Sequence, residues 1–496
     1  MFTYCKPTRE SKRKITALGI KTIVGNGISI TIQTVARKIE RDFYMKIKRV
    51  VGFLTALIIL AATTGSCKMP EKYSESLTES ITDEPFVLKK EVPLKVYINT
   101  LDNYQADLCS RASNIYAASY GEKVEYLSYR IDPILGNNAN TEDNSQKLYT
   151  DIIAGKGPDV MVLSSEFGMN IYKMMDAGAY IDLNRLINND DGFDIDMYEN
   201  SILEAGTYRE SRLFMPIIYS VPLLLTTKIK MEGYSLELSD FSSYDRFLDT
   251  SKNMLASENI RVTNDYGLYQ LFNASGWLSE CIDFNNNSMN LDNFIFPDIV
   301  ELMRASSKHS ETYGYLYPQD SYSYSGSALY DKGFASLLSN LFSIESFLAG
   351  AKDESDNVIM IPIPNFYGNT TAQINYFCLI SASSKNIEGA WDFIKILLSD
   401  QIQGNLNYFN GVGVKTKFIE SNIKRINDEH CDVHEKNLNQ LSDIYKSCDN
   451  AIILDNPIGN FILVQMSFYI ENQPEAGSFE TEKAKTENYI GIWLSE

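Results

Sequence analysis

The stretch from residue 146 to 165, QKLYTDIIAGKGPDVMVLSS, constrains the fold more than any other part of this chain. Its first half has apolar residues three to four apart, which predicts one face of a short helix. Gly155 and Gly157 can adopt the positive φ that ends a helix, and Pro158 favours an extended segment after them. Residues 160–163, VMVL, form an unalternated apolar run, typical of a parallel strand buried on both faces.

Polar residues follow this strand and also follow an earlier one, LKVYI at 94–98. Open α/β sheets bind their ligands at the carboxyl ends of parallel strands. Side chains at these two strand ends are therefore the first candidates for ligand contact. They are Asn99, Asp102, Ser164, Ser165 and Glu166.

Strands and helices alternate through the first part of the chain. Strands are expected at 94–98, 123–129 and 160–163, with helices at 105–119 and 146–153 between them and a polar loop at 137–145. This rhythm predicts a parallel sheet with right-handed crossovers.

The segment LFMPIIYSVPLLLTT, residues 213–227, is apolar and contains Pro216 and Pro222. Two prolines cannot both lie in one central strand, because each lacks the N–H that the neighbouring strand needs. The segment is therefore expected to leave one sheet and enter another.

Several motifs, in this order, resemble those of the extracellular solute-binding proteins of ABC importers, in the class that carries sugars. The resemblance spans roughly residues 92–420, and the order of the motifs supports it more than any single one. The matching segments are AGKGPDV at 154–160, the proline-bearing segment at 213–227, the stretch at 277–303, GFASLLSN at 333–340, VIMIPIP at 358–364, SSKNIEGAWDFIKILL at 383–398 and GVGVK at 411–415.

This resemblance implies an α/β fold of the periplasmic-binding-protein-like type II class, with two α/β lobes, a hinge and a cleft between the lobes. The first lobe is expected to comprise residues 92–218 and 373–410, and the second lobe residues 219–372 and 411–496. Hinge motion would close the lobes on a ligand.

The resemblance also implies a function. A member of this class captures a sugar or oligosaccharide and delivers it to the permease subunits of a transporter, and we expect a monomer. Sugar C–H faces pack on aromatic rings, so aromatic residues join the candidate ligand contacts. The resemblance adds Tyr219 near the hinge, and Asn340 and Phe342 after the GFASLLSN strand; Trp277 and Tyr324 are further aromatic candidates.

The amino-terminal region reads as a targeting segment. Residues 46–49 carry three basic side chains, and the apolar run at 50–64 is too short for a comfortable membrane span. The sequence TGSC at 64–67 then resembles a lipobox, which implies cleavage before Cys67 and attachment of a lipid to it. A plain transmembrane anchor that starts further upstream is the alternative.

Residues 45–66 would form the lipoprotein signal peptide, because Met45 opens it directly. Residues 1–44 would then be an upstream extension that arises from a mis-assigned start. Residues 67–91 are polar and aperiodic, as expected of a flexible tether. The body would lie on the outer face of the cytoplasmic membrane, in the periplasm if there is an outer membrane.

The charge is distributed unevenly. The chain has a formal charge of −19, yet residues 1–66 contain 12 Lys and Arg against 3 Asp and Glu, so the remaining residues have a net charge of −28. Such an acidic body argues against nucleic acid as a partner and leaves neutral or cationic ligands open.

Cysteines and histidines predict no metal, no cofactor and no disulfide framework. Cys431 and Cys448 could pair across their loop, but the remaining cysteines are scattered and odd in number. His430 and His434 have a spacing that metals can use, but no third ligand is near. The loop at 188–192 resembles a calcium loop without the required carboxylates, so an Asn-rich turn is expected there.

A glycoside hydrolase is the main competing class. It would need two carboxylates at one site, and Asp102 and Glu166 are the available pair. No nucleophile-elbow, HExxH or phosphate-loop motif occurs, and three histidines supply little acid–base chemistry. We expect a binding protein and not an enzyme. The alternatives within binding are a peptide, polyamine or other cationic ligand, or a sensory lipoprotein that presents its ligand to a membrane kinase.

Overall fold

The structure is a computed structural model of the chain, which divides into two units, residues 1–84 and residues 85–496. All described residues lie in the second unit. They are residues 93–99, 103–127, 141–165, 171–258, 260, 262, 276, 281–283, 288–292, 295–307, 334–338, 341–350, 357–365, 368, 370–406, 411–426, 433–453, 456–471, 473–474 and 476–495.

A seven-stranded sheet has the order β13-β6-β12-β3-β1-β2, with β14 also paired to β12. Strands β2, β1 and β3 are mutually parallel, as the alternation of elements predicted. The sheet as a whole is mixed, because β12 runs antiparallel to both β3 and β6. Its strands are β1 (Leu94–Ile98), β2 (Val124–Leu127), β3 (Val160–Ser164), β6 (Met215–Ser220), β12 (Thr371–Ile380), β13 (Val412–Gly413) and β14 (Asn450–Ile453).

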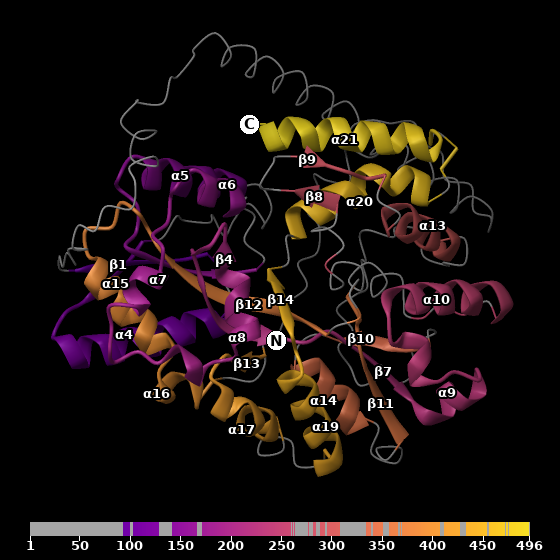
Figure 1. Cartoon of the computed structure of the whole chain (residues 1–496), viewed down its shortest axis with the longest axis horizontal. Coiled ribbons are helices and arrows are strands. Elements are labelled where there is room, and N and C mark those ends of the chain that lie inside the picture. Colours follow the sequence, from indigo (N-terminus) through magenta and orange to yellow (C-terminus); the bar gives the residue numbers. More distant parts are fainter. Residues whose placement is uncertain are drawn as a thin grey trace, which may run out of the picture. The chain divides into compact units, whose positions relative to one another are not determined.

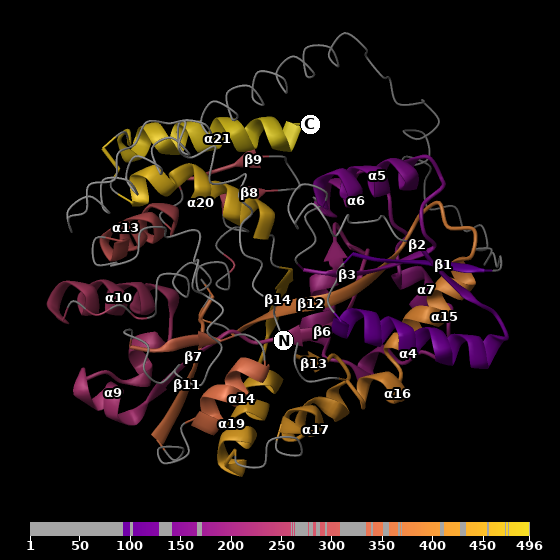
Figure 2. The ribbon, with the colours of Figure 1, turned by 180° about the vertical axis from the view of Figure 1, so that it is seen from behind.

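Helices cover both faces of the part of this sheet that contains β1, β2 and β3. Helices α4 (Asn103–Tyr120) and α15 (Ile387–Leu397) lie side by side on one face, and α5 (Thr141–Ile153) and α6 (Ile171–Asp176) lie on the other (Figures 1 and 2). Helix α5 starts at Thr141, so the prediction of a loop was wrong for residues 141–145. Gly155, with φ of 69°, follows the helix as predicted.

A separate, smaller sheet has three antiparallel strands in the order β10-β7-β11. Leu223 and Leu225 of β7 belong to the same hydrophobic core as the large sheet, whereas Leu224 belongs to a second core. The two faces of this small sheet therefore contribute to two different cores. Its strands are β7 (Leu223–Thr227), β10 (Ser336–Leu338) and β11 (Val358–Pro362); helix α14 (Leu341–Gly350) contributes to the first core, and α10 (Tyr244–Glu258) and α13 (Ile295–Ser307) contribute to the second.

The chain passes between the two sheets at neighbouring places. Val221 and Pro222 separate β6 from β7, and residues 363–370 connect β11 to β12. The backbone N–H of Ile363 donates to the carbonyl of Pro222 at 3.3 Å, so the two connections are in contact. The prediction that residues 213–227 leave one sheet for another is confirmed.

The described residues between 412 and 453 pack with the large sheet, whereas we expected residues 411–496 in the second lobe. Strands β13 and β14 pair with β6 and β12, and helices α17 (Ile419–Lys424) and α19 (Glu435–Lys446) add their apolar sides to the first core. The last two helices, α20 (Asn456–Ile470) and α21 (Phe479–Ser495), contribute to the second core.

The remaining elements are short. They are α7 (Asn184–Ile187), α8 (Asn200–Leu203), α9 (Lys228–Gly233), α16 (Asp400–Gln403), the hairpins β4 (Thr207–Tyr208) to β5 (Ser211–Arg212) and β8 (Ile282–Asp283) to β9 (Ser288–Met289), and the 3-10 turns Ile195–Met197, Glu204–Gly206, Leu238–Phe241 and Thr416–Phe418. Within the described ranges, no helix combines the length and the apolar character needed to cross a membrane.

Candidate functional site

Asn99 and Ser164 meet at the carboxyl ends of β1 and β3. These strands are parallel neighbours, with Ile98 opposite Val162, so their ends fall at one edge of the sheet. The backbone N–H of Ser164 donates to Asn99 Oδ1 at 2.8 Å, and Asn99 Nδ2 donates to Ser164 Oγ at 3.2 Å. The structure thus brings together two residues that strand-end reasoning selected.

Gln105, in the first turns of α4, extends this pair into the core. Its side chain is fully buried, and its Nε2 donates to Asn99 Oδ1 at 3.2 Å and to the backbone carbonyl of Val162 at 2.8 Å. Sequence reasoning missed this residue, because a polar residue within a predicted helix carries no sign of the direction in which it points.

Asn375, in β12, connects this pair of strand ends to the end of β6. The register of β12 against β6 shifts between Ile374 and Tyr376, so Asn375 lies at a β-bulge. Its carbonyl accepts from the backbone N–H of Ser165 at 3.0 Å, and its Oδ1 accepts from Ser220 Oγ at 3.0 Å. The only signal for it in the sequence was a polar residue directly before the apolar run 376–380.

We call these residues the strand-end cluster: Asn99, Gln105, Ser164, Ser165, Ser220 and Asn375. All of them are uncharged, and they offer amide and hydroxyl groups. Ser220 ends β6, directly before the Val221–Pro222 connection to the small sheet. The cluster therefore lies beside the place where the chain passes between sheets, a common location for ligand sites in α/β proteins.

Tyr219 lies in the core and not in the strand-end cluster. Its side chain is fully buried, its ring centroid is 5.6 Å from that of Tyr445, and its hydroxyl donates to the carbonyl of Tyr445 at 3.2 Å. Burial raises the pKa of Tyr219 well above its ordinary value. Because this side chain already has its polar partner inside the protein, we no longer propose it as a ligand contact.

The other candidate contacts lie at the limits of the described residues or outside them. Phe342 is the second residue of α14, so it follows β10 on a helix, and only its backbone lies within the described part. The remaining candidates lie outside the described residues: Asp102, Glu166, Trp277, Tyr324, Asn340 and the expected lipid attachment residue Cys67.

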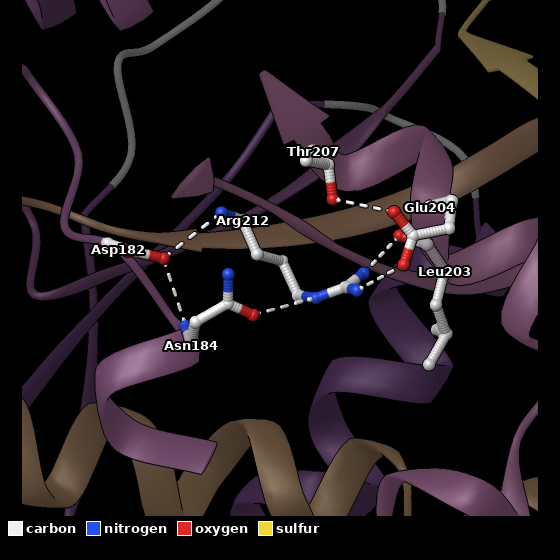
Figure 3. A network of polar contacts seen from close by, with 6 residues as sticks. All are labelled: Asp182, Asn184, Leu203, Glu204, Thr207 and Arg212. Atoms are coloured by element: carbon white, nitrogen blue, oxygen red, sulfur yellow. Dashed lines mark hydrogen bonds and ion pairs between the residues drawn. The ribbon is translucent and has the colours of Figure 1, made fainter. Parts of the chain in front are cut away.

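Arg212 forms a second polar network, which stabilises the fold (Figure 3). Its guanidinium is 4% exposed and donates to Asn184 Oδ1 at 3.3 Å, to Glu204 Oε1 at 2.8 Å and to the carbonyl of Leu203. Its backbone N–H donates to Asp182 Oδ1 at 3.0 Å. The network fastens hairpin β4–β5 to the segments that precede α7 and follow α8, and a buried cation held in this way is not available to a ligand.

Asp190, in the loop that resembles a calcium loop, binds two side chains of α15. Asp190 accepts from Trp391 Nε1 and from Lys395 Nζ, both at 2.8 Å. Burial opposes ionisation of Asp190, but these hydrogen bonds outweigh it and lower its pKa. Cys448 is a free thiol, and His430 and Cys431 lie outside the described residues. Within the described ranges, no group of three His, Cys, Asp or Glu residues could hold a metal ion.

Comparisons with known proteins agree with this architecture. A family model described as bacterial extracellular solute-binding protein matches residues 135–404. A search of curated proteins found no match.

Among solved structures, a bacterial solute receptor, AcbH, described as having an exclusive preference for β-D-galactopyranose, is 10% identical with a TM-score of 0.56, and the match covers 81% of this chain and 100% of that one. A putative oligosaccharide periplasmic-binding protein from Synechococcus sp. MITs9220 is 12% identical with a TM-score of 0.53, covering 81% and 99%. A cyclic α-maltosyl-1,6-maltose binding protein from Arthrobacter globiformis is 13% identical with a TM-score of 0.51, covering 81% and 98%.

At these identities the solved structures establish the fold, which is the α/β fold that the sequence predicted. The family model extends over more than half of the chain, from α5 through β3 and both connections between the sheets to α16. The chain belongs to the family of bacterial extracellular solute-binding proteins.

Proposed function

We propose that this protein captures a sugar or oligosaccharide at the strand-end cluster and delivers it to the permease of an ABC transporter. The observation that carries the proposal is the convergence of Asn99 and Ser164 at adjacent parallel strand ends. Amide and hydroxyl groups held at a strand end can exchange hydrogen bonds with sugar hydroxyls without any chemical step.

The uncharged character of the strand-end cluster favours a neutral ligand. A polyamine or a basic peptide would need a carboxylate partner, and the cluster contains none. The net charge of −28 after residue 66 keeps a cationic ligand as the second candidate, with Asp102 and Glu166 as its partners. The similar proteins described as binding β-D-galactopyranose, cyclic α-maltosyl-1,6-maltose or an oligosaccharide support the neutral candidate.

Closure around the ligand would use the connections between the sheets. We propose that residues 221–222 and 363–370 form a hinge between a lobe built on the large sheet and a lobe built on the small sheet. The first lobe would include residues 412–453 in addition to the expected ranges. Phe342, Asn340, Trp277 and Tyr324 remain proposed contacts from the second lobe.

The location follows in part from the family, whose members act outside the cytoplasm. We propose that the chain is anchored to the outer face of the membrane by a lipid on Cys67, with residues 67–91 as a tether. A monomer of this kind would reach the permease by diffusion over the membrane surface.

A thermal-shift screen of the purified full chain tests the proposal. The screen would compare D-galactose, maltotriose and acarbose with spermidine and a basic tripeptide, and we expect stabilisation by a saccharide, since a ligand that binds only the folded state raises its stability. Stabilisation by spermidine or the tripeptide alone would contradict it. Mass spectrometry of the incubated saccharide separates binding from hydrolysis, because a glycoside hydrolase would release shorter products.

Replacing Ser164 by Ala is the sharpest single change at the proposed site. We expect the variant to bind its saccharide with a loss of about 1 kcal/mol, the usual value of a neutral hydrogen bond, measured by calorimetry. Ser251→Ala is a matched control, because Ser251 is also buried but lies in α10 and donates to the carbonyl of Phe247. Equal effects of the two changes on affinity would remove Ser164 from the site.

A further inference from the structure

Two backbone groups fix the orientation of two side-chain amides in the strand-end cluster. The N–H of Ser164 can only donate, so the Asn99 atom 2.8 Å away must be the oxygen Oδ1. The carbonyl of Val162 can only accept, so the Gln105 atom 2.8 Å away must be the nitrogen Nε2. Both assignments also satisfy the third contact, in which Gln105 Nε2 donates to Asn99 Oδ1 at 3.2 Å.

These contacts determine which hydrogen-bond donors and acceptors remain at the strand end for a ligand. Asn99 Oδ1 accepts two hydrogen bonds, which fills its lone pairs. Asn99 Nδ2 uses one hydrogen on Ser164 Oγ, and its second hydrogen has no acceptor among the described residues. The hydroxyl hydrogen of Ser164 likewise has no acceptor there. The Asn99–Ser164 pair therefore presents donors to a ligand.

We propose that Gln105 is a positioning residue that locks the Asn99 amide so that the site presents donors to an acceptor atom of the ligand, such as a sugar hydroxyl or ring oxygen. This inference rests on the proposed function and adds a specificity rule to it. Gln105 itself makes no ligand contact, because it is fully buried between α4 and β3. Without its Nε2 group, the Asn99 amide loses one of the two donors that hold its oxygen inward.

The chain offers a matched control for Gln105. Gln403 in α16 is also fully buried, and its Nε2 donates to the backbone carbonyls of Leu397 at 2.9 Å and Ile217 at 3.3 Å. It contacts no member of the strand-end cluster in the described structure. Gln403 Oε1 also accepts from the backbone N–H of Lys415 at 3.2 Å. Gln403→Met therefore removes at least as many buried hydrogen bonds as Gln105→Met, and we expect it to lose at least as much thermal stability.

Calorimetry of the full chain with D-galactose, maltotriose and acarbose separates the two variants. We expect Gln105→Met to bind the saccharide about five- to tenfold more weakly than wild type, and Gln403→Met to bind it unchanged. Gln105→Glu is a second variant that keeps the size; a carboxyl buried beside the Asn99 and Val162 oxygens stays protonated and can donate only one hydrogen bond where the amide donates two, so we expect it to bind the saccharide more weakly than wild type. Wild-type affinity in both Gln105 variants, or equal losses in Gln105→Met and Gln403→Met, would overturn the inference.

Nuclear magnetic resonance of the Asn99 side-chain NH₂ group gives a test that needs no ligand. We expect its two proton resonances to move in Gln105→Met and to stay in place in Gln403→Met. If no saccharide binds wild type, the proposed function fails while this measurement still decides the role of Gln105. Unmoved Asn99 resonances in Gln105→Met would refute that role.

Discussion

Asp159 joins the Gly-Pro-Asp turn to β1 through one carboxylate oxygen and to the start of α15 through the other. Its Oδ2 accepts from the N–H of Lys95 at 2.9 Å, and its Oδ1 accepts from Ser384 Oγ at 2.8 Å and from the N–H groups of Lys385 and Asn386 at 3.2 and 3.3 Å. The most recognisable motif of the sequence therefore holds the fold together. The proposed ligand contacts lie just beyond it, at Ser164 and Ser165.

Replacing Asp159 by Asn tests this role. Either orientation of the amide turns an NH₂ group toward a backbone N–H, so we expect the free energy of unfolding to fall by about 1–3 kcal/mol in urea titrations. Asp107→Asn is the control, since Asp107 forms an ion pair with Arg111 at 3.0 Å on the surface and should change stability by less than about 1 kcal/mol. Equal losses in the two variants would show that the hydrogen bonds of Asp159 stabilise the fold no more than a surface ion pair does.

The position of a residue could be predicted where the backbone alone decides it. Asn99 and Ser164 could be selected because any residue after a parallel strand lies at the ligand edge of the sheet. Gln105 and Asn375 could not, because one depends on the rotation of α4 about its axis and the other on a β-bulge. Neither the helix rotation nor the bulge leaves a local pattern in the sequence.

At the scale of elements, long apolar segments were predictable and short pairings were not. Strand β1, with bounds Leu94–Ile98, and helix α15 follow from local hydrophobic pattern. Strands β13 and β14 are two and four residues long, and they form only because β6 and β12 offer them free edges. Their place in the large sheet is a tertiary effect, which explains why this pairing was not expected from the sequence.

Gly411, just before β13, provides a prediction at this scale. Its φ is 129°, and a Cβ there would lie 2.1 Å from the carbonyl oxygen of Tyr219. We expect Gly411→Ala to lower the free energy of unfolding by at least about 2 kcal/mol, because the new atom pushes β13 away from β6.

Gly491→Ala is the matched control, since Gly491 lies within α21 and a Cβ there meets nothing within 4 Å. We expect it to raise the free energy of unfolding by about 0.5–1 kcal/mol through the higher helix propensity of alanine. Chemical denaturation of both variants would be compared. A stabilising or neutral Gly411→Ala would contradict the close contact between β13 and β6.

At the scale of the whole molecule, the net charge of the chain differs from the local composition of the proposed site. This difference explains how an acidic chain can bind a neutral ligand. The net charge is summed over the whole chain, whereas the strand-end cluster, at one edge of the large sheet, contains amides and hydroxyls. Net charge alone therefore left the class of ligand open, and the composition of one sheet edge favours a carbohydrate.

Isothermal titration of the purified full chain with D-galactose, maltotriose, acarbose and spermidine tests the central claim most directly. We predict that one saccharide binds per chain, that spermidine does not bind at the site, and that Asn99→Leu weakens the saccharide at least about tenfold, because it removes the donor and the bonds that orient Ser164. Binding of spermidine without any saccharide, or undiminished saccharide binding by Asn99→Leu, would contradict the account.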